Sequence, residues 1–137
     1  MKMLLTKKFV FEMAHALDGY DGKCANLHGH SYHLEVTVET PAEPPQEGMH
    51  LDFHTLKQLV QSEIIDRYDH ALVLKSGTSL ASTADGMPNL RVVDFNPTTE
   101  NLLLYFASLL TPHIPHSARL YSIRLSETDT STAELIL

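Results

Sequence analysis

The sequence predicts an α+β fold in which an antiparallel sheet of four strands carries two helices on one face. Two runs of alternating apolar and polar residues near the start of the chain, and two more at its end, predict the strands, because side chains alternate between the faces of a sheet. Two longer runs between them repeat apolar residues every three or four positions, which predicts amphipathic helices. Strands and helices grouped in this way are typical of the α+β class.

The first two predicted strands span residues 3–13 and 28–40. In the first strand, one side carries Phe9, Phe11 and Met13. In the second strand, one side carries Tyr32, Leu34, Val36 and Val38. Residues 18–26 lie between the strands and are rich in turn-forming residues. Each run therefore predicts a strand with one buried side.

The first predicted helix covers residues 53–68, with Asp52 as its N-cap. Its apolar stripe consists of Leu56, Leu59, Val60, Ile64 and Tyr68. Three prolines between residues 41 and 45 end the preceding strand, because proline has no backbone donor for the ladder. Residues 49–51 between these features are a candidate for a short additional strand.

The second half of the chain begins with a predicted surface loop over residues 75–89, which is rich in Ser, Thr, Gly and Ala and has no periodicity. Residues 91–95 are a candidate short strand. Asn96 and Pro97 introduce the second helix, whose broad apolar face lies within residues 102–110. Two final strands are predicted over residues 119–127 and 132–137.

The composition indicates one folded domain over residues 1–137, since 43% of the residues are hydrophobic and 20% are charged. The formal net charge of −7 argues against a nucleic-acid partner, because such proteins concentrate Lys and Arg against phosphates. No apolar run approaches the roughly 20 residues that span a bilayer, and no signal peptide is evident. The single cysteine excludes an intrachain disulfide. A cytoplasmic protein without a membrane partner is therefore expected.

A histidine cluster is the strongest chemical signal in the sequence. His28 and His30 stand two apart on one predicted strand, so both imidazoles leave the same face, and His15 extends the buried side of the first strand. Three histidine ligands suit Zn²⁺ and leave its fourth position open, as in catalytic sites. The alternative is that all three are core histidines bonded to backbone, although satisfying three on one apolar side would be costly.

Cys24 stands four residues before His28 in a loop that contains glycine. A divalent cation nearby would favour the thiolate, which could then act as a base. A structural role for this cysteine is equally open from the sequence, although its neighbours in sequence are not apolar.

Asp69, His70 and Glu127 could also take part in chemistry. Asp69 and His70 place an acid beside an imidazole, which can relay a proton, although such pairs also occur by chance. Glu127 follows Tyr121, Ile123 and Leu125 at steps of two, so its carboxylate is expected on the buried side of its strand. It would there form an ion pair with an internal arginine, or receive the paired N–H donors of a pterin or guanine ring.

Thr98, Thr99 and Glu100 open the second helix, where capping accounts for them, although helix N-termini also donate to ligands. The remaining five histidines are interpreted as ordinary surface or capping residues: His33, His50, His54, His113 and His116.

Six short motifs, in order along nearly the whole chain, resemble those of the 6-pyruvoyltetrahydropterin synthase and 6-carboxytetrahydropterin synthase family. They are FEMAH at 11–15, CANLHGH at 24–30, LDF at 51–53, DH at 69–70, NPTTEN at 96–101 and SET at 126–128. The resemblance implies the tunnelling fold (T-fold), in which the sheets of several subunits close into a barrel. It also implies a homohexamer of two stacked trimers, with active sites between subunits.

The resemblance further implies a role for each candidate residue. Zinc would be bound by His15, His28 and His30, and Cys24 would be the general base, with Asp69 and His70 as its proton-relay partners. Glu127 would anchor the pterin ring of the substrate, 7,8-dihydroneopterin triphosphate, with Thr98 and Thr99 nearby.

Within the family, the three residues between Cys24 and His28 resemble the short spacing of the 6-carboxytetrahydropterin synthases of queuosine biosynthesis. Their product is 6-carboxy-5,6,7,8-tetrahydropterin, with loss of triphosphate and acetaldehyde. The segment DHALVLKSG and the loop after it depart from that branch. A synthase that stops at 6-pyruvoyltetrahydropterin, one that cleaves the side chain toward folate precursors, and a non-catalytic pterin- or purine-binding protein are the alternatives.

Overall fold

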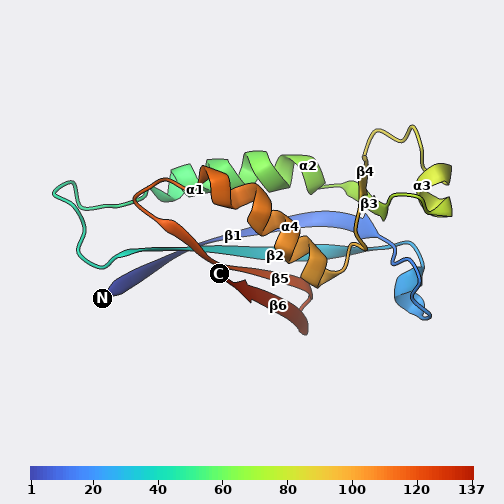
Figure 1. Ribbon diagram of the computed structural model, residues 1–137, viewed down its shortest axis with the longest axis horizontal. Helices are drawn as coiled ribbons and strands as arrows, with labels where there is room; N and C mark the ends of the chain where they lie inside the picture. The colour runs from blue at the N-terminus through green and yellow to red at the C-terminus, as the bar shows by residue number, and fades with distance from the viewer.

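A curled sheet of six strands forms the frame of the molecule, in a computed structural model that describes residues 1–137 (Figure 1). The order across the sheet is β4-β3-β1-β2-β5-β6. The strands are β1 (Lys2–His15), β2 (His28–Pro41), β3 (Ala71–Lys75), β4 (Leu90–Val93), β5 (Arg119–Thr128) and β6 (Ser131–Ile136).

The predicted four-stranded antiparallel sheet is wrong in strand number and in direction. β1, β2, β5 and β6 are antiparallel neighbours, as expected, but β3 pairs with β1 in parallel and β4 pairs with β3 in parallel. β3 is a short apolar run without alternation, because side chains on both of its faces are buried. Periodicity therefore could not reveal it. The candidate strand at residues 91–95 is confirmed as β4, whereas residues 49–51 form no strand.

The first predicted helix is present over residues 53–68 as three consecutive segments: α1 (Phe53–Val60), a π-helical turn η2 (Gln61–Ile65) and α2 (Asp66–Tyr68). The Asp52 side chain accepts a hydrogen bond from the His54 amide at 2.8 Å, which confirms the N-cap. Figure 1 shows this helical segment running alongside the long strands β1 and β2. No helix of the protein is long and apolar enough to cross a membrane.

The second predicted helix is α4 (Thr99–Leu110), followed by a 3-10 turn, η3 (Thr111–His113). The loop predicted over residues 75–89 is corrected in part, because it contains the short helix α3 (Ser79–Thr83). Thr78 caps α3 by accepting from the Ala81 amide at 3.3 Å. A helix of five residues is too short to give a periodic signal.

The main core lies between the sheet and the two long helical segments, so both cover the same face. Tyr32, Leu34 and Val36 from β2 are fully buried there against Leu56 of α1 and Phe106 of α4. Burying such a side chain contributes about 1.5–3 kcal/mol. A smaller cluster on the other side of β3 consists of Ala16, Leu72, Leu74 and Ala84. It joins α3 to the end of the sheet where β1 and β2 are connected.

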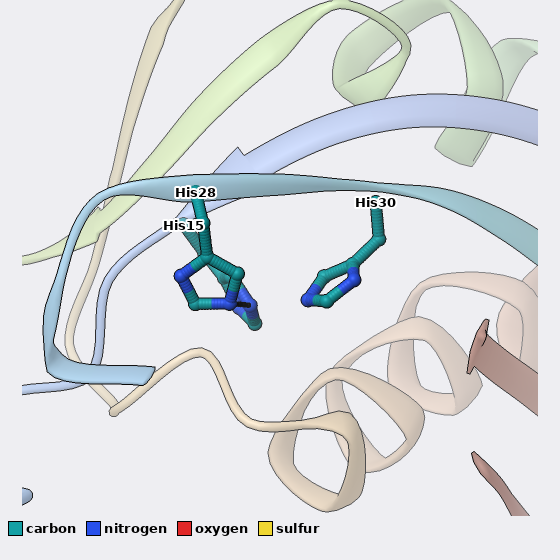
Figure 2. Close-up of side chains that lie close together, drawn as sticks. All are labelled: His15, His28 and His30. Carbon is teal, nitrogen blue, oxygen red and sulfur yellow. Dashed lines mark hydrogen bonds between the residues drawn. The ribbon is translucent and has the colours of Figure 1, made fainter. Parts of the chain in front are cut away.

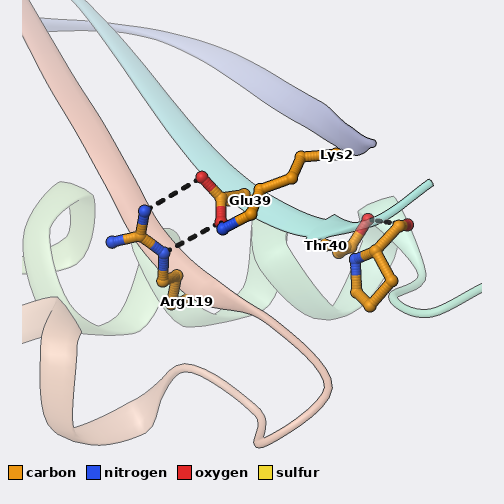
Figure 3. A network of polar contacts seen from close by, with 5 residues as sticks. Lys2, Glu39, Thr40 and Arg119 are labelled. Carbon is orange, nitrogen blue, oxygen red and sulfur yellow. Dashed lines mark hydrogen bonds and ion pairs between the residues drawn. The ribbon is translucent and has the colours of Figure 1, made fainter.

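The opposite end of the sheet is closed by a polar network (Figure 3). Arg119 of β5 donates to both carboxylate oxygens of Glu39 on β2, at 3.0 and 2.9 Å. Lys2 of β1 donates to the same carboxylate. These donors hold the pKa of the Glu39 carboxyl at about 2. The network ties three adjacent strands together at the end away from the histidines.

Candidate metal centre and active-site cavity

Three histidines converge where the β1–β2 hairpin ends. His15 and His28 are register partners, and His30 faces Met13 two positions further along the ladder. Figure 2 shows the three rings pointing toward one another. The Nε2 atoms of His15 and His28 are 3.1 Å apart, and one ligand atom from each of the three rings lies within 4.8 Å of the others. The predicted cluster therefore exists as a set of three convergent nitrogen donors.

Backbone carbonyls orient two of these rings. His15 Nδ1 lies 2.7 Å from the carbonyl oxygen of Pro97, and His28 Nδ1 lies 2.6 Å from that of Asn26. A carbonyl oxygen only accepts, so each Nδ1 carries a proton and each Nε2 is the nitrogen left to bind a metal. Two lone pairs at 3.1 Å repel unless a cation lies between them. This orientation is typical of metal-binding histidines.

His30 completes the set in a different way. Its Nε2 is buried and has no hydrogen-bond partner, which costs about 1–3 kcal/mol for a polar group. Burial also lowers the pKa of both His15 and His30, so these rings are neutral at pH 7, the form that binds metal. The interpretation as core histidines bonded to backbone therefore fails for His30. Three convergent imidazoles fit a zinc ion and leave its fourth position open.

A cavity of about 410 Å³ opens beside His15. The structure brings four other predicted site residues into its wall: Cys24, Thr98, Thr99 and Glu127. The rest of the wall is formed by Leu17, Tyr20, Glu100, Ser131, Thr132 and Ala133. A thiol, a carboxylate and a metal-binding imidazole thus face one space that is large enough for a small bicyclic ligand.

Glu127 reaches this cavity from an irregular part of β5. Its Oε1 lies 3.9 Å from His15 Nε2, and the ladder to β6 is shifted between Ser126 and Thr128, so Glu127 has no partner on β6. The predicted alternation with Tyr121 is wrong, because a second irregularity in the pairing with β2 places Leu120 rather than Tyr121 in the core. Bulges of this kind often direct a side chain at a functional site.

Cys24 lies in the loop of residues 16–27 that connects β1 to β2, here called the thiol loop. It belongs to a 3-10 turn, η1 (Lys23–Ala25), and its side chain is exposed. The Cys24 carbonyl accepts from the Leu17 amide at 3.0 Å, which closes the base of the loop. Packing in a core therefore does not account for this cysteine.

Asp69 and His70 lie elsewhere. His70 helps to line a separate cavity of about 350 Å³, together with Glu12 and His30, and no residue of its wall belongs to the cavity of Cys24. The Glu12 amide donates to Asp69 at 2.9 Å, and His70 Nδ1 is 3.0 Å from Asp69 Oδ1. His70 has a φ of +63°, a strained conformation for a residue other than glycine. Within one chain, His70 and Cys24 therefore line no common cavity.

Four groups near the candidate metal centre escaped sequence reasoning. The Pro97 and Asn26 carbonyls give no signal in a sequence, because every residue has one. Tyr32 looked like an ordinary core residue, yet its hydroxyl lies 3.4 Å from His15 Nδ1, and burial raises its pKa so that it stays protonated. Glu100 was assigned to capping but also lines the cavity. The five histidines assigned to the surface lie outside the cavity wall.

Comparison with known proteins gives one family. The family model described as 6-pyruvoyl tetrahydropterin synthase matches residues 4–136. The chain is 36% identical to the 6-carboxy-5,6,7,8-tetrahydropterin synthase of Haemophilus influenzae, over 95% of this chain and 96% of that protein. It is 29% identical to the protein of the same name from Rickettsia bellii, over 95% and 97%.

Solved structures share the fold. An uncharacterized protein from Wolinella succinogenes superposes with a TM-score of 0.84 at 22% identity, over 99% of this chain and 98% of that chain. The 6-pyruvoyl tetrahydropterin synthase of Caenorhabditis elegans superposes with a TM-score of 0.75 at 22% identity, over 100% and 96%. At 22% identity, these similarities are evidence for a shared fold.

Proposed function

Because the chain belongs to the 6-pyruvoyl tetrahydropterin synthase family, we propose that it converts 7,8-dihydroneopterin triphosphate into 6-carboxy-5,6,7,8-tetrahydropterin. The reaction releases triphosphate and acetaldehyde, and it is the step that serves queuosine biosynthesis. Two relatives with the name of the carboxy enzyme cover nearly the whole chain. The short spacing between Cys24 and His28 favours the same branch.

The observation that carries the proposal is the convergence of His15, His28 and His30 beside the cavity of Cys24 and Glu127. When bound there, zinc would polarise the side-chain hydroxyls of the substrate and acidify the adjacent C–H positions. Zinc is proposed from the type of ligand, although iron or nickel would tolerate the same imidazoles.

The protein's own residues bind the ring and move protons. Glu127 accepts the paired N–H donors of the pterin edge, because a carboxylate matches two parallel donors. Thr98 and Thr99 border the same end of the cavity, although the Thr98 hydroxyl also accepts from the Asn101 amide at 3.2 Å. Cys24, as the thiolate, removes a proton from the side chain of the substrate. Leu17 and Tyr20 add apolar and aromatic surface to the cavity wall.

We further propose that the active form is a homohexamer. His70 lines a different cavity from Cys24, so we infer that a relay between Cys24 and the Asp69–His70 pair takes the pair from a neighbouring copy. The edge strands β4 and β6 leave backbone groups for pairing between copies. A thiol that stays reduced also favours a cytoplasmic location.

Product analysis tests the proposed reaction. The purified protein is incubated with 7,8-dihydroneopterin triphosphate, and the pterin product and acetaldehyde are quantified. We expect acetaldehyde and the 6-carboxy product in equal amounts. A product that keeps its three-carbon side chain would instead favour the 6-pyruvoyl reaction. That second candidate has support from a Dictyostelium discoideum relative named 6-pyruvoyl tetrahydrobiopterin synthase, which is 28% identical over 93% of this chain.

Replacing the thiol separates catalysis from binding. Cys24→Ala removes the proposed base but no metal ligand, so turnover should fall by about 10²-fold or more while a pterin still binds. A non-catalytic pterin-binding protein would show no turnover to lose. His33→Ala, on the opposite face of β2 from His30, is the matched control and should leave turnover unchanged.

A further inference from the structure

We propose that Asn96 is a positioning residue that holds the thiol loop in register with the metal centre. Its side-chain amide makes two hydrogen bonds with the backbone of Asp18: Oδ1 accepts from the Asp18 amide at 2.8 Å, and Nδ2 donates to the Asp18 carbonyl at 2.8 Å. The kinetic part of this inference rests on the proposed function, and the structural part does not.

The contact lies at the closed end of the loop. Asp18 follows Leu17, whose amide donates to the Cys24 carbonyl at 3.0 Å. The thiol loop begins directly after His15 and ends directly before His28, so its position decides where Cys24 lies relative to both rings. Fixing Asp18 therefore fixes the segment that carries the thiol.

The other side of Asn96 is anchored to the metal centre through its backbone. The Asn96 carbonyl accepts from the Thr98 amide at 2.8 Å and from Asn101 Nδ2 at 2.9 Å, which attaches it to the start of α4. The next residue, Pro97, supplies the carbonyl that orients His15. One residue thus connects the thiol loop, the start of α4 and the orientation of a metal-binding ring.

The chemistry of the side chain explains why asparagine stands here. The Asp18 peptide presents one donor and one acceptor, and a carboxamide is the smallest side chain that pairs with both. The other polar contact to Asp18 is the ion pair between its Oδ2 and Lys75 Nζ at 3.8 Å. Such an exposed pair contributes little to holding a loop. Of the polar contacts to Asp18, those of the Asn96 amide therefore contribute most to holding the loop.

The side chain can be removed without disturbing the anchor. Asn96→Ala deletes only the two bonds to Asp18, because the contacts to α4 are made by the backbone carbonyl. Asn96→Asp keeps an acceptor for the Asp18 amide but turns a second acceptor toward the Asp18 carbonyl, so it should disturb the loop at least as much as alanine. Gln61→Ala is the matched control, since that amide bonds Asp66 at 2.7 Å on the helical segment.

Hydrogen exchange tests the structural part with the zinc-loaded protein. In Asn96→Ala, we expect amide exchange across residues 17–25 to speed up by about tenfold or more, as two lost hydrogen bonds imply. The rate at which iodoacetamide alkylates Cys24 should differ between this variant and the wild type. Exchange within β1 and β2 should stay as in the wild type, and Gln61→Ala should change nothing in this region.

Kinetics test the link to catalysis. We expect kcat of Asn96→Ala to fall by about tenfold or more, with a smaller change in KM, one metal ion still bound per chain, and no recovery in Asn96→Asp. Unchanged loop exchange, unchanged kcat, or loss of the metal would each overturn the proposal. If the wild type itself does not turn over dihydroneopterin triphosphate, the proposed function fails, and the exchange result still decides whether Asn96 holds the loop.

Discussion

At the scale of single residues, the metal centre depends on the difference between three imidazoles that look alike in the sequence. His15 and His28 each form a hydrogen bond from Nδ1 to a backbone carbonyl, whereas His30 has a buried Nε2 without a partner. A buried polar atom without a partner destabilises a fold, and a bound ion would relieve that cost. The His30 Nε2 atom therefore supports a candidate metal site at this cluster.

Replacing His30 by leucine tests that arrangement. His30→Leu should lose zinc, because two imidazoles remain, and the metal-free variant should be more stable than the metal-free wild type by about 1 kcal/mol. Urea unfolding with chelator and metal analysis without it measure the two effects. His33→Leu, on the other face of β2, should keep its zinc. A metal-free His30→Leu that is clearly less stable than wild type would show that Nε2 has a partner after all.

At the scale of elements, alternation predicted the long strands and periodicity predicted the long helices. The boundaries of β2 and β5 agree with prediction to within one residue, because each has one buried face. β3 and α3 could not be predicted, since one is buried on both faces and the other is a single capped turn. The pairing irregularities in β5 have no signal in the sequence, and they decide how Glu127 reaches the cavity.

A second prediction concerns Glu39, at the end of the sheet away from the histidine cluster. The pKa of Glu39 is lowered to about 2, chiefly by the hydrogen bonds from Arg119 and then by Lys2. A lowered carboxyl pKa stabilises the fold above the unfolded-state value of about 4.3, and this contribution is lost as the pH falls toward 2. Glu39→Gln should therefore lower the Tm by a few degrees at pH 7 and progressively less below pH 4.

Thermal unfolding across pH measures this difference. Glu35→Gln is the control, because Glu35 forms looser ion pairs with Lys8 at 3.2 Å and Arg124 at 3.8 Å on the same face. It should change the Tm much less. A Glu39→Gln deficit that is the same at pH 3 and pH 7 would contradict the role assigned to the charged network.

At the scale of the whole molecule, the candidate site is divided. His15, Cys24 and Glu127 line one cavity, whereas His70 lines another together with His30. Sequence order alone cannot reveal such a separation, because it says which residues a chain carries and not which cavity each one faces. The strained His70 conformation and the bond from Glu12 to Asp69 show that the pair is held firmly where it is.

Mixing two inactive variants tests whether copies share sites. Cys24→Ala and His70→Ala should each be inactive alone. Refolded or co-expressed together, they should recover activity at about one site in four, because each shared site takes the thiol from one copy and the pair from another. Activity assays on the mixed oligomer, with each pure variant as control, measure this. Mixed oligomers that stay inactive would mean that the relay does not cross between copies.

The most direct test of the account is X-ray absorption at the zinc edge on protein purified without added metal, combined with metal analysis. We predict one zinc ion per chain, with three nitrogen ligands at about 2.0–2.1 Å and no sulfur ligand at about 2.3 Å. In His30→Ala the three-nitrogen signal should be lost. Protein without stoichiometric metal, or a sulfur atom bound to zinc in the resting protein, would contradict the claim that His15, His28 and His30 form the metal centre beside a free Cys24 thiol.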